Sequence, residues 1–208
     1  NLTPRANVRC CHKHRPGSYD FLPESARIWQ QRTTCGLKPK NASEEILEVV
    51  DENDRVIGTE RRGVIHAQGL MHRSAQVLVF NYRGDLFVQK RSQSKDEFPG
   101  LWDSSAAGHV DPGESYLECA RRELEEELGI SRPVDLREIC RFPASRDTGY
   151  EHCAVHRCTW DGALVFQPGE VDDGRWLKPA EMDALVSDAK ARLTPAIRQI
   201  WLAIRDTL

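Results

Sequence analysis

Four glutamates lie close together within residues 108–130 of this sequence: Glu114, Glu123, Glu126 and Glu127. The last three stand at positions i, i+3 and i+4, which in an α-helix fall within an arc of roughly 100° on one face. Like charges placed in this way repel each other by about a few tenths of a kcal/mol per pair. A hard divalent cation held by oxygen ligands would offset the repulsion, so the spacing indicates a metal site.

The remaining residues of the same helix fit this interpretation. Arg122 is four residues from both Glu118 and Glu126, so it can hold carboxylates in place. Arg121 and Glu125 point away from the acidic face, toward water. A solvated acidic helix is the alternative, and the spacing favours the metal site over it. An adjoining apolar stripe suits packing on a sheet and consists of Leu117, Ala120, Leu124 and Leu128.

The stretch resembles the Nudix box, G-x5-E-x7-R-E-U-x-E-E-x-G-U, in which U is a bulky aliphatic residue. The resemblance implies an α/β fold, a Nudix-type α/β/α sandwich with a mixed β-sheet. It also implies Mg²⁺-dependent hydrolysis of a nucleoside diphosphate linked to another group. The box positions are matched without exception by Gly108, Glu114, Arg122, Glu123, Leu124, Glu126, Glu127, Gly129 and Ile130.

The resemblance also assigns roles within the box. It implies that Glu123, Glu126 and Glu127 are metal ligands, assisted by the Gly108 carbonyl and by Glu114. These oxygen donors suit Mg²⁺, with Mn²⁺ as the alternative. Catalysis is expected from Glu126, Glu127 and Glu123, and Arg122 is expected to orient these carboxylates.

Residues outside the box must contact the substrate and supply a general base. Lys90 and Arg91 end a predicted strand near the site in this fold, and Arg91 is the favoured phosphate contact, with Lys95 in the following loop. Sequence alone assigns no residue to a nucleobase. The general base is left open between a box glutamate and a later carboxylate, for which the candidates are Glu151, Glu170, Asp172 and Asp173.

A looser similarity, from about residue 44 to the C-terminus, points to the isopentenyl-diphosphate isomerase branch of the same superfamily. His72, His109 and Glu151 fall where that branch places metal ligands, and His66 lies near another such position. The branch assigns its proton transfers to a cysteine and a glutamate, but this sequence has Ala107 and Cys153 at those positions. Isomerase activity is therefore the second interpretation, behind hydrolysis.

Composition limits the other classes. The chain has 208 residues, a formal net charge of −3 and seven cysteines. The small net charge gives no sign of a nucleic-acid or membrane surface. No apolar run reaches the roughly 18 residues of a membrane span, and no signal-peptide core is present. The cysteines lack the spacing of a disulfide scaffold, which favours a reducing, cytoplasmic setting. The expected partner is a small nucleotide-like molecule, and the resemblance admits a homodimer.

The chain divides into two parts by composition. Residues 1–43 are polar and basic and almost without hydrophobic periodicity, which predicts a flexible N-terminal extension. The hydrolase domain is expected to cover residues 44–208. Within the extension, a group of potential zinc ligands lacks the two ligand pairs of a zinc site. This group consists of Cys10, Cys11, His12, His14 and Cys35.

Hydrophobic patterns in the second part predict the elements that must position the site. A short helix or loop is expected at residues 63–69, and a long polar loop at 92–102. Helices are expected at 179–186 and 195–205, the second of them amphipathic. Strands and helices in this order indicate an α/β/α sandwich. Strands are expected at 46–51, 56–62, 75–81, 86–91, 104–107, 136–142, 152–160 and 175–177.

Overall fold

The computed structural model describes residues 42–207. The predicted extension, apart from its last two residues, lies outside the described residues, and so do its potential zinc ligands. The strands are β1 (Ile46–Val50), β2 (Val56–Arg61), β3 (His72–Phe80), β4 (Leu86–Arg91), β5 (Trp102–Asp103), β6 (Ala106–His109), β7 (Arg137–Phe142), β8 (Glu151–Thr159) and β9 (Val171–Leu177). The helices are α2 (Arg62–Gln68), α3 (Tyr116–Leu128), α4 (Pro179–Ser187) and α5 (Pro195–Ile204), with short 3₁₀ turns at Ala42–Glu44, Arg146–Thr148 and Arg205–Thr207.

A mixed seven-stranded sheet forms the centre of the domain. Its strands follow the order β5-β4-β3-β8-β7, with β6 paired to β3 and β9 paired to β4. The β3–β8 pair is parallel, and the other pairs are antiparallel. The early part of β3 pairs with β6, and its last residue, Phe80, pairs with β4. This arrangement places β6, which carries the first box residue Gly108, beside the central strand β3.

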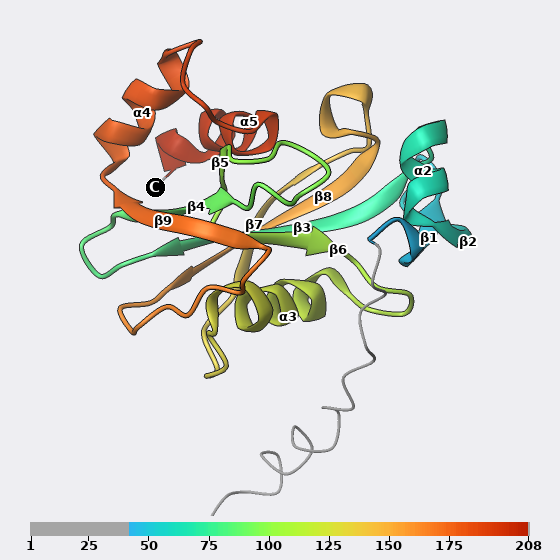
Figure 1. Ribbon diagram of the computed structural model, residues 1–208, viewed down its shortest axis with the longest axis horizontal. Coiled ribbons are helices and arrows are strands. Elements are labelled where there is room, and N and C mark those ends of the chain that lie inside the picture. Colours follow the sequence, from blue (N-terminus) through green and yellow to red (C-terminus); the bar gives the residue numbers. More distant parts are fainter. Residues whose placement is uncertain (1–41, 208) are drawn as a thin grey trace, which may run out of the picture. The chain divides into compact units, whose positions relative to one another are not determined.

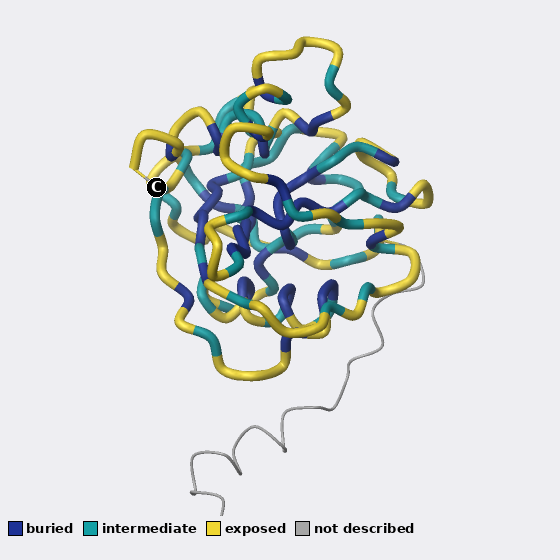
Figure 2. The backbone as a smooth tube through the Cα atoms, turned by 90° about the vertical axis from the view of Figure 1, so that its left-hand side faces the viewer, coloured by how far each residue is buried: buried dark blue, intermediate teal, exposed yellow. Residues whose placement is uncertain are grey.

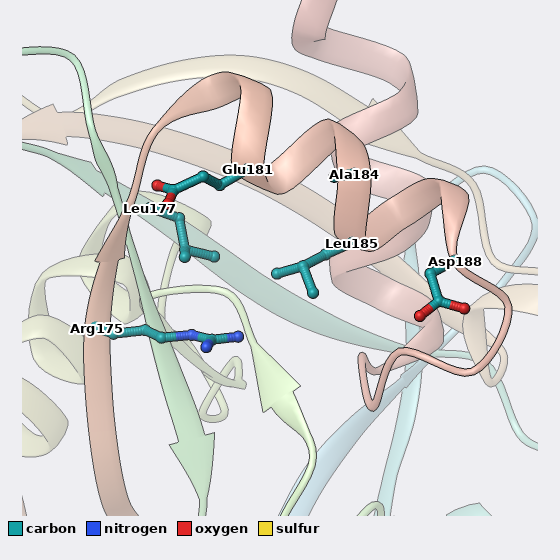
Figure 3. A pocket seen from close by; sticks show the side chains of 6 residues that line it. All are labelled: Arg175, Leu177, Glu181, Ala184, Leu185 and Asp188. Atoms are coloured by element: carbon teal, nitrogen blue, oxygen red, sulfur yellow. The ribbon is translucent and has the colours of Figure 1, made fainter.

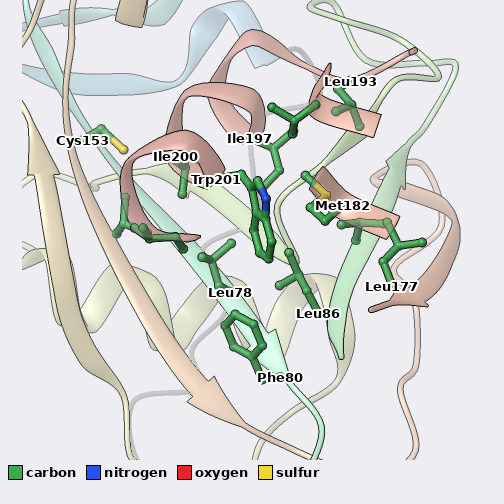
Figure 4. Packing of buried hydrophobic residues seen from close by; sticks show 14 residues of the cluster. Leu78, Phe80, Leu86, Cys153, Leu177, Met182, Leu193, Ile197, Ile200 and Trp201 are labelled. Carbon is green, nitrogen blue, oxygen red and sulfur yellow. The ribbon is translucent and has the colours of Figure 1, made fainter. Parts of the chain in front are cut away.

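Helices cover both faces of this sheet, with α3 on one face and α4 and α5 on the other (Figure 1). The buried residues run through the interior, and the exposed ones follow the loops (Figure 2). On the α4 and α5 face, Trp201 is 1% exposed and packs against Leu78 and Ile197 (Figure 4). On the α3 face, Leu124 and Leu128 pack against Val77 and Val79 of β3. Burial of each such side chain contributes roughly 1.5–3 kcal/mol. The predicted α/β/α sandwich is confirmed.

Most predicted elements are present, and the differences have local causes. Residues 62–68 are helical, and this helix ends at Gly69, whose φ of 64° lies in the left-handed region. β3 begins at His72, three residues before the predicted start, because its backbone pairing with β8 already includes His72, Arg73 and Ser74. β9 begins at Val171 rather than at residue 175, since backbone pairing with β4 includes the exposed Asp173.

A separate two-stranded sheet, β1–β2, packs beside the start of β3. Arg73 of β3 donates hydrogen bonds to Asp54 (2.6 Å) and to Glu48 (3.1 Å) of this hairpin. Glu48 in turn accepts a hydrogen bond from the Gly113 N–H at 3.0 Å, so the hairpin also fixes the turn before α3. Within residues 42–207, no helix is long and apolar enough to cross a membrane.

Candidate metal and catalytic site

The connection from β6 to α3 is fixed by a tight turn and a well-formed helix cap. Gly113 has φ 79°, a conformation that glycine adopts without strain. The Ser115 hydroxyl accepts a hydrogen bond from the Glu118 N–H, and the Glu118 carboxylate accepts one from the Ser115 N–H. The helix ends at Gly129, which has φ 68°. These caps fix where α3 begins and ends.

The contact between α3 and β6 is close because position 108 is glycine. A Cβ at Gly108 would lie only 1.9 Å from Oε1 of Glu123, so any larger residue would displace that carboxylate. Glu123 is 5% exposed. One turn earlier, the Cys119 thiol donates to the carbonyls of Gly108 (3.6 Å) and His109 (3.3 Å). A buried carboxylate and a backbone carbonyl therefore lie together at this contact.

Arg122 connects the carboxylates around the turn. Its guanidinium donates to both oxygens of Glu114 at 3.0 and 2.8 Å, to the His109 carbonyl at 2.9 Å, and to Glu123. Glu126 lies 3.7 Å from the same guanidinium. Burial alone would lower the pKa of Arg122, but Glu114 and Glu123 raise it above its usual value. Arg122 is thus a permanent cation, which supports its predicted orienting role.

Glu127 is the most deeply buried of the box carboxylates. It is 2% exposed, and its Oε2 accepts hydrogen bonds from the Gln89 side chain (2.9 Å) and the Ala107 N–H (3.0 Å). Burial raises the pKa of Glu127 to about 7, against the lowering effects of Lys95, Ala107 and Gln89. Glu170 raises it further. A nearby cation would stabilise the ionised form of this buried carboxylate.

The residues present fit a divalent cation. The space left by the missing Cβ of Gly108 holds the Glu123 carboxylate beside a backbone carbonyl, and both are hard oxygen donors. Glu126 keeps 33% of its side chain exposed, so a metal and its substrate can reach it. Glu114 differs, because both of its oxygens accept from Arg122 and one also accepts from the Asp111 N–H at 3.0 Å. Its role as a ligand stays a prediction, and these contacts favour a supporting one.

The predicted substrate contacts lie at the end of β4. The Arg91 guanidinium donates to the Glu97 carbonyl (3.1 and 3.0 Å) and to Asp103 (3.2 Å), which ties the following loop to β5. Lys90 is paired in the sheet with Trp102 of β5 and Asp173 of β9. The structure therefore places both cations at this strand end, and Arg91 already has several of its donors engaged.

One residue that contacts Glu127, Gln89, was not among the predicted site residues. Gln89 is 1% exposed and faces α3, two residues after Phe87, which packs on the same side. A polar residue on the buried face of a strand was the signal that could have identified it. Lys95 forms an ion pair with Glu170 across 75 positions of sequence, and no local pattern reveals such a contact.

A second cluster lies at the start of β3. His66, His72 and His109 have ring centroids 5.0–5.3 Å apart, and one potential ligand atom from each lies within 4.8 Å of the others. Glu151 Oε1 is 3.7 Å from His72 Nε2 and 3.6 Å from His109 Nε2. The buried Nε2 atoms of His66 and His72 have no hydrogen-bond partner. Imidazoles in this arrangement suit a transition metal such as zinc.

The charges of this cluster are coupled. Burial alone would lower the pKa of His109, but Glu151 and Glu45 raise it to about 9. Burial alone would raise the pKa of Glu151, but His109 and His72 hold it well below the usual range. The predicted positions are therefore brought together, and His66 of α2 lies with them.

An open hollow of about 400 Å³ lies elsewhere, between β9 and α4 (Figure 3). Leu177 and Leu185 at this hollow belong to the core on the face opposite α3. None of the predicted site residues lines it. Its walls are formed by Arg175, Leu177, Glu181, Ala184, Leu185 and Asp188.

Comparison with known proteins agrees with the fold and with the box sequence. Residues 70–199 match the family model described as the NUDIX domain. An uncharacterized Nudix hydrolase of Pseudomonas aeruginosa is 42% identical over 135 residues, which cover 65% of this chain and 79% of that protein. Isopentenyl-diphosphate Delta-isomerase 2 of Photorhabdus laumondii is 32% identical over 165 residues, covering 76% and 88%. A crystal structure of a Deinococcus radiodurans protein is 28% identical, with a TM-score of 0.67 over 76% of this chain and 98% of that one.

Proposed function

Because this chain belongs to the Nudix hydrolase family, we propose that it is a Mg²⁺-dependent enzyme that cleaves a phosphoanhydride bond in a nucleoside diphosphate derivative. The proposed substrates are ADP-ribose, a dinucleotide cofactor or a nucleoside di- or triphosphate. One observation carries this proposal: Glu123 and Glu127 are buried against the backbone of β6 and are held there by Arg122 and Gln89. Such placement of negative charge suits a cation that binds phosphate.

The box residues would hold the metal ion. Glu123, Glu126 and Glu127 would be its ligands together with the Gly108 carbonyl, and Arg122 would hold the carboxylates in place. When bound, the cation neutralises phosphate charge and lowers the pKa of a bound water, which creates a nucleophile near neutral pH. Mn²⁺ would fit the same oxygen donors.

Cations at the end of β4 would bind the phosphates. Arg91 and Lys90 remain our proposed substrate contacts, and Arg91 keeps N–H groups beyond those that bind Glu97 and Asp103. Lys95 is a further candidate, because its flexible side chain is partly exposed where it pairs with Glu170. The predictions of a cytoplasmic setting and of a homodimer rest on the sequence and the resemblance alone.

The decisive experiment compares wild type with Glu126→Gln in product formation from a panel of nucleoside diphosphate compounds with Mg²⁺. We expect hydrolysis of one class, lowered by orders of magnitude in Glu126→Gln, with no change in melting temperature. Glu125→Gln is the matched control, because Glu125 is exposed on the same helix. Equal activity of Glu126→Gln and Glu125→Gln would refute the metal assignment. Electron paramagnetic resonance of Mn²⁺ gives an activity-independent readout, and Glu126→Gln should weaken its binding.

The histidine cluster favours a second candidate function, isopentenyl-diphosphate isomerase activity. His72, His109 and Glu151 lie together as the resemblance to that branch implies. Proton transfer at carbon argues against it, because Ala107 has no ionisable group and burial raises the pKa of Cys153 to about 12. Isopentenyl diphosphate therefore belongs in the same panel. Isomerisation without nucleotide hydrolysis would reverse the order of the two candidates.

A further inference from the structure

The loop after β4 and the segment before β9 are joined beside the box. Lys95 of the loop forms an ion pair with Glu170 of the segment. The Ser92 N–H donates to the Glu170 carbonyl at 2.9 Å, and the Ser94 hydroxyl donates to the Gly169 carbonyl at 3.0 Å. The side chains of Lys95 and Glu170 are 24% and 33% exposed, so substrate and water can reach both.

This ion pair lies close to the carboxylate end of the box. The Gln167 N–H donates to the Glu127 carbonyl at 3.1 Å, which holds the segment carrying Glu170 against the end of α3. Burial raises the pKa of Glu127, while Lys95 lowers it and Glu170 raises it. The Glu170 N–H donates to the Gln167 carbonyl at 3.1 Å, so a single turn of chain joins Glu170 to the contact with the end of α3.

The other later carboxylates are committed elsewhere. Glu151 lies within 3.7 Å of two histidines of the second cluster. Asp172 accepts a hydrogen bond from the Gln93 N–H at 3.0 Å. Asp173 accepts one from the adjacent Gly174 N–H at 2.8 Å. The carboxylate of Glu170 is instead paired with a flexible ammonium group, which an anionic ligand can draw away.

We propose that Glu170 is the general base of the hydrolysis, and that Lys95 holds it in place until a substrate phosphate attracts the lysine. The assignment rests on the proposed hydrolase function. The water oxygen forms a bond to phosphorus as one of its protons passes to Glu170. The bond between that phosphorus and the bridging oxygen breaks, and its electron pair leaves with the departing phosphate group. The proton on Glu170 then passes to this group or to solvent.

The test compares Glu170→Gln with Lys95→Met on the best substrate of the nucleotide panel. Both changes break the same ion pair, but only the first removes the carboxylate. Glu170→Gln should lower kcat by about 10²–10⁴-fold with little change in KM. Lys95→Met should raise KM by about tenfold or more, with a far smaller effect on kcat. Equal losses of kcat in the two variants would overturn the assignment, because the ion pair would then matter only as a tie between loops.

Asp172→Asn is the matched control, since Asp172, near the start of β9, also binds the loop after β4 and is exposed. It should keep the wild-type kcat, and a loss in Asp172→Asn without one in Glu170→Gln would refute our choice of carboxylate. Mn²⁺ binding should be unchanged in Glu170→Gln and weakened in Glu126→Gln. If Glu126→Gln loses activity and Glu170→Gln does not, only the base assignment fails. If Glu126→Gln keeps both activity and Mn²⁺ binding, the proposed function itself fails.

Discussion

Replacing Gly108 with alanine tests whether the close contact between β6 and α3 shapes the metal site. The added Cβ would lie 1.9 Å from Oε1, 2.2 Å from Cδ and 2.9 Å from Cγ of Glu123. The φ angle of Gly108 is not positive, so alanine brings no conformational strain there. Any effect of the substitution must therefore come from displacement of the Glu123 carboxylate or of the strand.

The size of the effect follows from what Glu123 contacts. The side chain is 5% exposed and paired with Arg122, so it cannot turn away without losing that partner. Overpacking costs about 1–3 kcal/mol, and loss of a charged hydrogen bond about 1.5–3 kcal/mol. Since the two costs overlap, we expect a loss of about 2–4 kcal/mol in unfolding free energy, or about 4–16 °C in melting temperature. Mn²⁺ affinity should fall by about 10–100-fold.

Thermal denaturation measures the loss of stability, and electron paramagnetic resonance of Mn²⁺ measures the loss of metal affinity. Gly58→Ala is the control, because a Cβ there would meet no atom within 4 Å. In the double variant Gly108→Ala with Glu123→Ala, the colliding side chain is absent, so stability should recover while Mn²⁺ binding stays weak. If Gly108→Ala keeps the stability and Mn²⁺ affinity of Gly58→Ala, the contact does not position Glu123, and our reasoning about the site is wrong.

Two further predictions concern buried polar groups. Gln89→Leu removes a donor from the buried carboxylate of Glu127 and should lower the unfolding free energy by about 1–3 kcal/mol in urea denaturation; unchanged stability would show that this hydrogen bond contributes nothing. Burial lowers the pKa of His156, so the unfolded chain binds its proton more readily, and stability should fall as pH drops below about 6.5. Urea denaturation at about pH 7.5 and about pH 5.5 measures this effect. The unfolding free energy of His156→Leu relative to wild type should be higher at the lower pH, and the same difference at both pH values would contradict the prediction.

Local patterns account for most of what could be predicted from the sequence. The periodicity of α3 and its flanking glycines belong to one continuous stretch, and its buried and exposed faces are confirmed by Leu124 and Glu125. Competition between local partners was harder to predict. Glu118 lies four residues from Arg122, but it forms the capping box with Ser115, and Arg122 binds Glu114 instead. A free helix terminus offers its N–H groups to the nearest carboxylate, and spacing alone does not reveal this choice.

Contacts between distant strands could not be derived from spacing. The histidine cluster depends on α2 and on the pairing of β3 with β6, and only resemblance to a known branch indicated it. The contact between Gln89 and Glu127 joins residues 38 positions apart, and that between Lys95 and Glu170 joins residues 75 positions apart. Such pairs follow from strand order, which hydrophobic alternation within one strand does not determine.

The register of three neighbouring strands separates the isomerase-like positions from the proposed hydrolysis site. Ser74 of β3 is paired with His109 on one side and with Cys153 on the other, so these positions form one row across β6, β3 and β8. Isomerisation would need a proton donor and a proton acceptor beside this row. Ala107 can serve as neither, and burial keeps the Cys153 thiol protonated at neutral pH by raising its pKa to about 12. The proposed hydrolysis needs neither group, because the box carboxylates lie at the opposite contact, between β6 and α3. Loss of proton transfer on one face of the strand therefore leaves the proposed hydrolysis on the other face intact.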